Sequence, residues 1–82
     1  MYFSVVIPTY NRIDMLVRVL DALREQVDAP EFETIVVNDG SKDDTDRLLR
    51  DRRDITYRAQ ENSGPGLARN LGVSLARGRF IV

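Results

Sequence analysis

The apolar residues of this 82-residue chain change their spacing in a regular alternation, and few folds are compatible with that pattern. Short apolar runs, typical of strands buried on both faces, alternate with segments whose apolar residues recur every three or four positions, as on one face of a helix. The resulting order β-α-β-α-β-α-β predicts an α/β fold, with helices on both faces of a parallel, Rossmann-like sheet. At this length the chain has room for one domain at most.

Four segments are predicted to be strands. Phe3–Ile7 is a largely apolar run, rich in β-branched residues, that ends at Pro8. Phe32–Val37 is a second run of the buried type. Ile55–Ala59 alternates and suits an edge strand, and Arg79–Val82 begins a fourth strand.

The first predicted helix covers Arg12–Val27. Its apolar residues follow the spacing of an amphipathic helix, and they are Leu16, Val19, Leu20, Leu23 and Val27. The sequence Asp-Ala-Pro at positions 28–30 is expected to end this helix, because proline disrupts helical backbone hydrogen bonding.

The other two helices are predicted from their end signals. Ser41 stands three residues before Asp44, as in a capping box, so a short helix is expected from there to about Arg53. The third helix is predicted to start at Pro65, since proline suits the first turn, and to end at Gly78 as its C-terminal cap.

Composition excludes several classes of protein. The chain has no Cys and no His, so it has no disulfide, no Cys-based zinc site and no histidine base or ligand. With 12 Lys+Arg against 13 Asp+Glu it lacks the basic excess of a nucleic-acid surface, and no nucleic-acid partner is expected. No transmembrane segment and no signal peptide are recognisable. The expected location is therefore the cytoplasm, with the inner face of the membrane as an alternative for a longer protein.

Three loops are predicted to carry the function. In open sheets of parallel strands, ligands bind beyond the carboxyl ends of the strands, and residues 8–12, 38–42 and 61–66 are expected there. The glycines of the third loop do not form a dinucleotide-binding fingerprint, because Arg69 stands where that motif needs a small residue.

Asp39 has two interpretations. It follows an apolar strand and precedes Gly40, so it can be a turn residue whose carboxylate accepts hydrogen bonds from nearby backbone N–H groups. It can instead face the crevice, where a carboxylate, which only accepts hydrogen bonds, suits a nucleobase edge with a ring N–H donor. Uracil, thymine and guanine have such an edge, whereas cytosine does not.

Asn11 and Arg69 are equally open. Asn11 can be the N-cap of the first helix, or it can belong to a rigid loop that contacts a flat ligand. Arg69 can be an ordinary exposed helix arginine, or it can reach a phosphate or a base from beneath the crevice.

Taken together, four segments of the chain resemble one protein family. The segments are Val5–Arg12, Ile35–Thr45, Asn62–Gly72 and Ala76–Val82, in this order and in register. The set closely resembles the amino-terminal, nucleotide-binding part of family 2 inverting glycosyltransferases of the GT-A fold. The resemblance implies that residues 1–82 are the amino-terminal part of a single, incomplete catalytic domain. The sequence departs from the family pattern at Asn38, where Asp is commoner.

The resemblance also implies a ligand and its contacts. The chain would bind the nucleotide part of a nucleotide-diphospho-sugar, most readily a UDP-sugar, with Asp39 on the uracil ring N–H. The residues that the resemblance assigns to nucleotide binding are Pro8, Thr9, Tyr10, Asn11, Asp39, Gly64, Gly66 and Arg69. The parent enzyme would transfer the sugar with inversion to an acceptor hydroxyl, using a carboxylate base and a divalent cation, Mg or Mn. By the same resemblance their residues lie beyond residue 82, so no catalytic or metal residue is expected in this chain.

Two other functions stay open at this point. A sugar-phosphate nucleotidyltransferase shares the architecture, but it would carry a glycine- and arginine-rich loop after the first strand, which residues 8–12 do not form. A non-catalytic signalling or binding module could use Asp39 as a phospho-acceptor, although Asn38 stands where such a module gathers further acids. By resemblance the strand order is 3-2-1-4. The short apolar edge at Arg79–Val82 is then expected to recruit a second copy as a homodimer.

Overall fold

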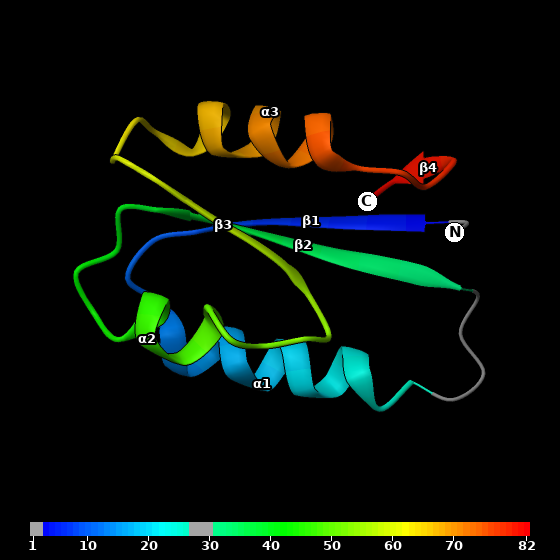
Figure 1. Ribbon diagram of the computed structural model, residues 1–82, viewed down its shortest axis with the longest axis horizontal. Coiled ribbons are helices and arrows are strands. Elements are labelled where there is room, and N and C mark those ends of the chain that lie inside the picture. The colour runs from blue at the N-terminus through cyan, green and yellow to red at the C-terminus, as the bar shows by residue number, and fades with distance from the viewer. Residues whose placement is uncertain (1–2, 27–30) are drawn as a thin grey trace.

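A computed structural model describes residues 3–26 and 31–82 of the chain (Figure 1). Its helices and strands occur in the predicted order. They are β1 (Phe3–Thr9), α1 (Ile13–Arg24), β2 (Phe32–Asp39), α2 (Thr45–Leu49), β3 (Thr56–Gln60), α3 (Pro65–Leu75) and β4 (Phe80–Ile81).

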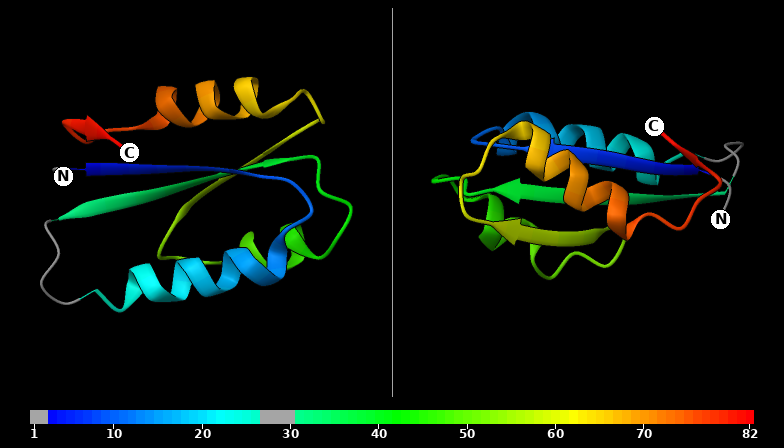
Figure 2. Two further views of the ribbon diagram at one scale, coloured as in Figure 1. Left: turned by 180° about the vertical axis from the view of Figure 1, so that it is seen from behind. Right: turned by 90° about the horizontal axis from the view of Figure 1, so that it is seen from above.

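The four strands form one parallel sheet in the order β3-β2-β1-β4, which confirms the predicted fold class and strand order. β1 pairs with β2 along its whole length, whereas β4 pairs with β1 only near its start, at Phe3 and Ser4. The Val82 amide extends this pairing by donating to the Ser4 carbonyl at 2.7 Å. Figures 1 and 2 show α3 on one face of the sheet and α1 with α2 on the other.

Each face of the sheet has its own apolar cluster. On the α1 face, Leu16 and Leu20 pack with Val36. On the α3 face, Ala68 packs against Val37 and its neighbours on the sheet. Because helices cover both faces, β2 is buried from its second residue to its end, as its continuous apolar run predicts.

The first helix differs from its prediction at both ends. α1 begins at Ile13 and ends at Arg24, so it is shorter than the predicted range. The predicted last residue, Val27, and the predicted break at 28–30 lie outside the described residues. Val19 was predicted to face inward, but its side chain is 43% exposed. The face turned to the sheet is centred on Ile13, Leu16 and Leu20, and Val19 lies to one side of that stripe.

The second helix is shorter than predicted and has another start. α2 covers five residues, Thr45–Leu49, and Ser41 is not its cap. The Ser41 hydroxyl instead accepts a hydrogen bond from the Asn11 amide at 2.9 Å, so a contact between two loops takes the group that the capping box would need. The N-cap residue is Asp44, and the Asp43 carboxylate accepts from the amide of Thr45, the first residue of the helix, at 3.0 Å.

Gly78 was predicted to cap the third helix, and this prediction is wrong. α3 ends at Leu75, and the segment that follows passes close to β1. The Gly78 amide donates to the Ser4 hydroxyl at 2.7 Å. A Cβ atom at Gly78 would lie 2.6 Å from the Phe3 carbonyl carbon, so a glycine is required here for close packing.

A buried carboxylate supports the same contact from the next strand. Glu33 Oε2 accepts hydrogen bonds from the Ser4 hydroxyl and from the Arg77 amide, each at 2.6 Å. Burial raises the pKa of Glu33, but these hydrogen bonds outweigh it, and the net pKa lies below the ordinary value. This network lies at the amino ends of β1 and β2.

β4 is an edge strand with exposed apolar side chains. Phe80 and Ile81 are 50% and 42% exposed. Pairing of a second copy along this edge stays a prediction.

Within the described residues, no helix combines the length and the apolar character needed to cross a membrane. The cellular compartment also stays a prediction.

Candidate functional site

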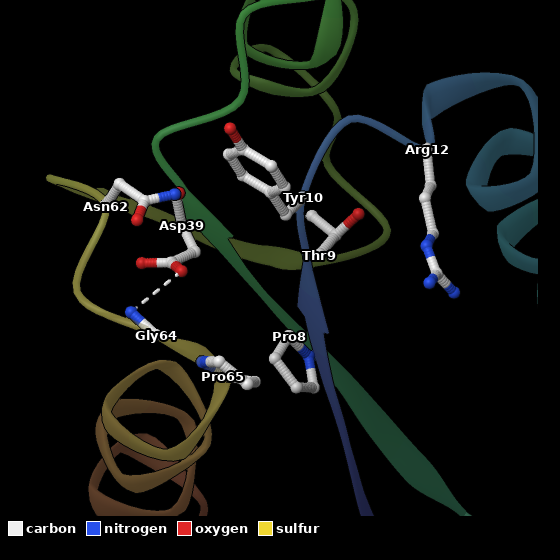
Figure 3. Close-up of a pocket in the computed structure, with 8 residues that line it drawn as sticks. All are labelled: Pro8, Thr9, Tyr10, Arg12, Asp39, Asn62, Gly64 and Pro65. Atoms are coloured by element: carbon white, nitrogen blue, oxygen red, sulfur yellow. Dashed lines mark hydrogen bonds between the residues drawn. The ribbon is translucent and has the colours of Figure 1, made fainter.

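A cavity of about 430 Å³ lies at the carboxyl ends of β1 and β2, where the sequence predicts the functional loops to meet. This volume falls in the range of small-molecule sites, roughly 300–1,000 Å³. The residues that line it are Pro8, Thr9, Tyr10, Arg12, Asp39, Asn62, Gly64 and Pro65 (Figure 3). All three predicted loops therefore contribute to one site.

Two walls of the cavity come from different parts of the chain. Figure 3 shows Pro8 and Thr9 at the end of β1 on one side, and Asp39 with Gly64 on the other. Thr9 is buried, whereas Tyr10 is 42% exposed, so an aromatic ring remains available to a ligand at the rim.

Asp39 is the buried polar centre of the cavity. Its Oδ1 atom accepts hydrogen bonds from the Gln60 side chain at 2.9 Å and from the Ser63 amide at 2.8 Å. Its Oδ2 atom accepts from the Gly64 amide at 3.0 Å. Led by the bond from Gln60, these donors hold the pKa of Asp39 below its ordinary value, so the carboxylate is charged at neutral pH.

The hydrogen bonds do not use the full capacity of the Asp39 carboxylate. Two carboxylate oxygens offer about four acceptor positions, and three are taken by donors within the described residues. The remaining position is on Oδ2, the atom with one bond. Asp39 thus anchors the third loop and has one acceptor position left, and its contact with a nucleobase stays a prediction.

Two glycines allow the second and third loops to approach each other. Gly40 has φ 76°, and a Cβ atom there would lie 2.8 Å from the Asn62 amide nitrogen. Gly64 has φ 99°, a backbone conformation that favours glycine even though the space around it is open. The Asn62 side chain also donates to the Asp39 carbonyl at 3.2 Å, so the two loops form one wall.

Five of the predicted nucleotide-binding residues line the cavity, and three do not. The five are Pro8, Thr9, Tyr10, Asp39 and Gly64. Gly66 and Arg69 are exposed on α3 and lie outside the cavity lining. Asn11 also lies outside it and is not the helix cap, since Arg12 takes that position.

Sequence reasoning missed three lining residues: Arg12, Asn62 and Pro65. All three belong to the predicted loops, and Arg12 carried a usable signal, because it is a cation in the same loop as Tyr10. Among the residues that the structure describes, no carboxylate forms an ion pair with the Arg12 guanidinium. Arg12 therefore places a positive charge at the cavity, on the wall opposite Asp39 (Figure 3).

Residues 3–26 and 31–82 contain no group of three or more His, Cys, Asp or Glu side chains that could hold a metal ion. What this part of the chain presents is an aromatic ring, a buried carboxylate and a guanidinium around one cavity.

The sequence profile of the family described as "Glycosyl transferase family 2" matches residues 4–82. Validoxylamine A glucosyltransferase of Streptomyces hygroscopicus subsp. limoneus is 49% identical over 79 residues, which cover 89% of this chain and 17% of that protein. Poly(ribitol-phosphate) beta-N-acetylglucosaminyltransferase TarS of Staphylococcus aureus is 35% identical, with 100% of this chain and 15% of that protein covered.

The fold has a close counterpart among solved structures. The crystal structure of S. aureus TarS 1-349 in complex with UDP matches with a TM-score of 0.85 and 36% identity, over 100% of this chain and 26% of that chain. The present chain thus spans 15% of the length of TarS and 26% of the TarS 1-349 chain. Since the family profile covers nearly every residue, the chain belongs to glycosyl transferase family 2.

Proposed function

We propose that the cavity binds the nucleoside diphosphate part of a nucleotide-diphospho-sugar, with a UDP-sugar as the preferred donor. The observation that carries the proposal is the remaining acceptor position on Asp39 Oδ2, at the wall of a cavity large enough for a small molecule. The solved complex of TarS with UDP supports the choice of uridine.

The proposed pose follows the chemistry of the two walls. The uracil ring N–H donates to Asp39 Oδ2, while the flat base lies against Pro8 and Thr9 with the Tyr10 ring beside it. The Arg12 guanidinium then faces the negatively charged end of the ligand, since guanidinium groups bind phosphates well. Contacts of the ligand with Gly66 and Arg69 stay predictions. Because these two residues do not line the cavity, a nucleotide-sugar would have to extend beyond the cavity to reach them.

The reaction of the whole protein is part of this proposal. We expect transfer of the sugar, with inversion, to an acceptor hydroxyl that a carboxylate base deprotonates. A divalent cation, Mg or Mn, would neutralise the leaving diphosphate when bound. The residues for both tasks are expected outside residues 1–82, so this chain by itself supplies donor binding. Neither a nucleotidyltransferase nor a phospho-acceptor module finds support in the relatives.

Calorimetric titration with four nucleotides tests the proposal. We expect UDP, dTDP and GDP to bind more tightly than CDP, because cytosine presents no ring N–H to Asp39. The loss of one charge-assisted hydrogen bond predicts a dissociation constant about tenfold higher for CDP than for UDP. Inorganic pyrophosphate serves as the control for binding through the phosphates alone. Equal affinities for UDP and CDP would contradict the assignment of Asp39.

A further inference from the structure

Asn11 has an unusual place at the rim of the cavity. It lies between Tyr10 and Arg12, which both line the cavity, although Asn11 itself does not. Its φ angle is 52°, in the left-handed region that residues with a side chain seldom adopt and that Asn tolerates better than most. The left-handed backbone at Asn11 therefore lies between two residues of the cavity lining.

Three hydrogen bonds join residues 11–13 to residues 41–43. The Asn11 amide donates to Ser41 Oγ at 2.9 Å, and the Lys42 amide donates to Asn11 Oδ1 at 2.7 Å. The Ile13 amide donates to Asp43 Oδ2 at 3.2 Å. We call this set the loop clasp. Because it joins segments about 30 positions apart, it fixes the first loop relative to the second.

The loop clasp is in turn held by the sheet. The Ser41 amide donates to Asn38 Oδ1 at 2.8 Å, and Asn38 is a buried residue of β2. Asn38 Nδ2 donates to the Tyr57 hydroxyl on β3 at 2.9 Å. The rim of the cavity is thus tied to the central strand β2, and through it to the edge strand β3, by side chains that do not line the cavity.

From this arrangement we infer that Asn11 is a positioning residue, which sets Tyr10 and Arg12 for the ligand through the loop clasp without touching the ligand. The inference rests on the proposed function, because it concerns binding of a nucleoside diphosphate at this cavity. It assigns to Asn11 a role different from the direct contact that the sequence resemblance implies.

Three substitutions separate the parts of this role. Asn11→Asp keeps an acceptor oxygen for the Lys42 amide, and Asn11→Gly keeps the backbone conformation but loses that oxygen. Asn11→Ala loses the oxygen and disfavours the left-handed backbone. We expect UDP affinity to fall least for Asn11→Asp and about five- to tenfold for Asn11→Ala. The larger loss is expected because Asn11→Ala removes one hydrogen bond of the loop clasp and also displaces the rim of the cavity. Asn70→Ala, at an exposed position of α3, is the matched control.

Two further measurements distinguish positioning from mere stability. The backbone amide signals of Tyr10 and Arg12 in the ligand-free chain should shift in Asn11→Ala and return towards their original positions in Asn11→Asp. In a double-mutant cycle, Asn11→Ala should cost UDP affinity in the unmutated chain and little more in an Arg12→Ala, Tyr10→Ala background. Should Asn11→Ala fail to fold, Asn11→Gly takes its place in the cycle.

The outcomes separate the two proposals. An unmutated chain that does not bind UDP overturns the proposed function, and this inference with it. If the unmutated chain binds UDP, and Asn11→Ala and Asn11→Gly bind UDP as tightly as the unmutated chain does, the inference alone is overturned. Full additivity of Asn11→Ala with the Tyr10 and Arg12 substitutions would also overturn it, because Asn11 would then act independently of the rim.

Discussion

Replacing Gly78 with alanine is expected to lower the free energy of unfolding by about 2–4 kcal/mol, a large share of the stability of a small domain. The added Cβ would lie 2.6 Å from the Phe3 carbonyl carbon and 2.7 Å from the Ser4 amide nitrogen. These are backbone atoms of β1, which cannot move aside as the end of a flexible side chain can. A shift of the 76–79 segment would also weaken the hydrogen bond from the Arg77 amide to Glu33.

Gly66→Ala is the matched control for this prediction. A Cβ at Gly66 meets nothing within 4 Å, and the residue lies in the first turn of α3. Alanine there should change stability by less than about 1 kcal/mol and in the stabilising direction, because it favours the helix. Urea denaturation of both variants measures the difference. Similar stabilities for Gly78→Ala and Gly66→Ala would show that the close approach to β1 has been misassigned.

Asp39→Asn is expected to weaken UDP binding by about tenfold or more. The carboxylate serves the Gln60 side chain and two backbone amides, and we propose that it also serves the ligand. An asparagine has one acceptor oxygen, so its NH₂ group would face two donors, either the Gly64 amide and the ligand N–H or the Gln60 side chain and the Ser63 amide. The substitution also removes the negative charge of the carboxylate, which strengthens the proposed hydrogen bond from the ligand N–H.

Two comparisons control the Asp39 experiment. Asp44→Asn removes a carboxylate from an exposed ion pair with Arg47 at 3.1 Å, outside the cavity lining, and should leave UDP affinity unchanged. Asn38→Asp should weaken UDP binding less than Asp39→Asn does, since Asn38 does not line the cavity. If Asp39→Asn bound UDP as tightly as the unmutated chain does, Asp39 would be an anchor for the third loop alone.

The fold and the location of the site could be predicted because both follow from short-range patterns. The alternating spacing of apolar residues indicates parallel strands with helical crossovers, and that topology places the carboxyl ends of the strands at one edge. The three loops at residues 8–12, 38–42 and 61–66 therefore lie close together even if the exact bounds of the helices and strands are predicted wrongly. Asp39 is predicted at this edge because it stands at the end of an apolar strand, and the structure places it among the residues that line the cavity.

The features that could not be predicted depend on contacts between distant residues. Ser41 has the spacing of a capping residue, but its hydroxyl accepts from Asn11, 30 positions earlier. Gly78 has the position of a helix cap in the sequence, but a glycine is required there because the backbone passes close to β1. Its hydrogen-bond partner on β1, Ser4, lies 74 positions earlier in the chain. The donors that surround Asp39 lie 21 to 25 positions further along the chain, so its role as a loop anchor is visible only in three dimensions.

The central claim is that the cavity at the carboxyl ends of β1 and β2 is the nucleotide site. Mapping of backbone amide chemical shifts during a UDP titration tests it most directly, since it reports the site residue by residue. We predict that the largest shifts fall within residues 9–12, 39–42 and 62–66, with small changes around Glu33 and Arg77 at the other end of the sheet. Saturable shifts centred on Glu33 and Arg77, or no saturable shift in the three loops, would contradict the account.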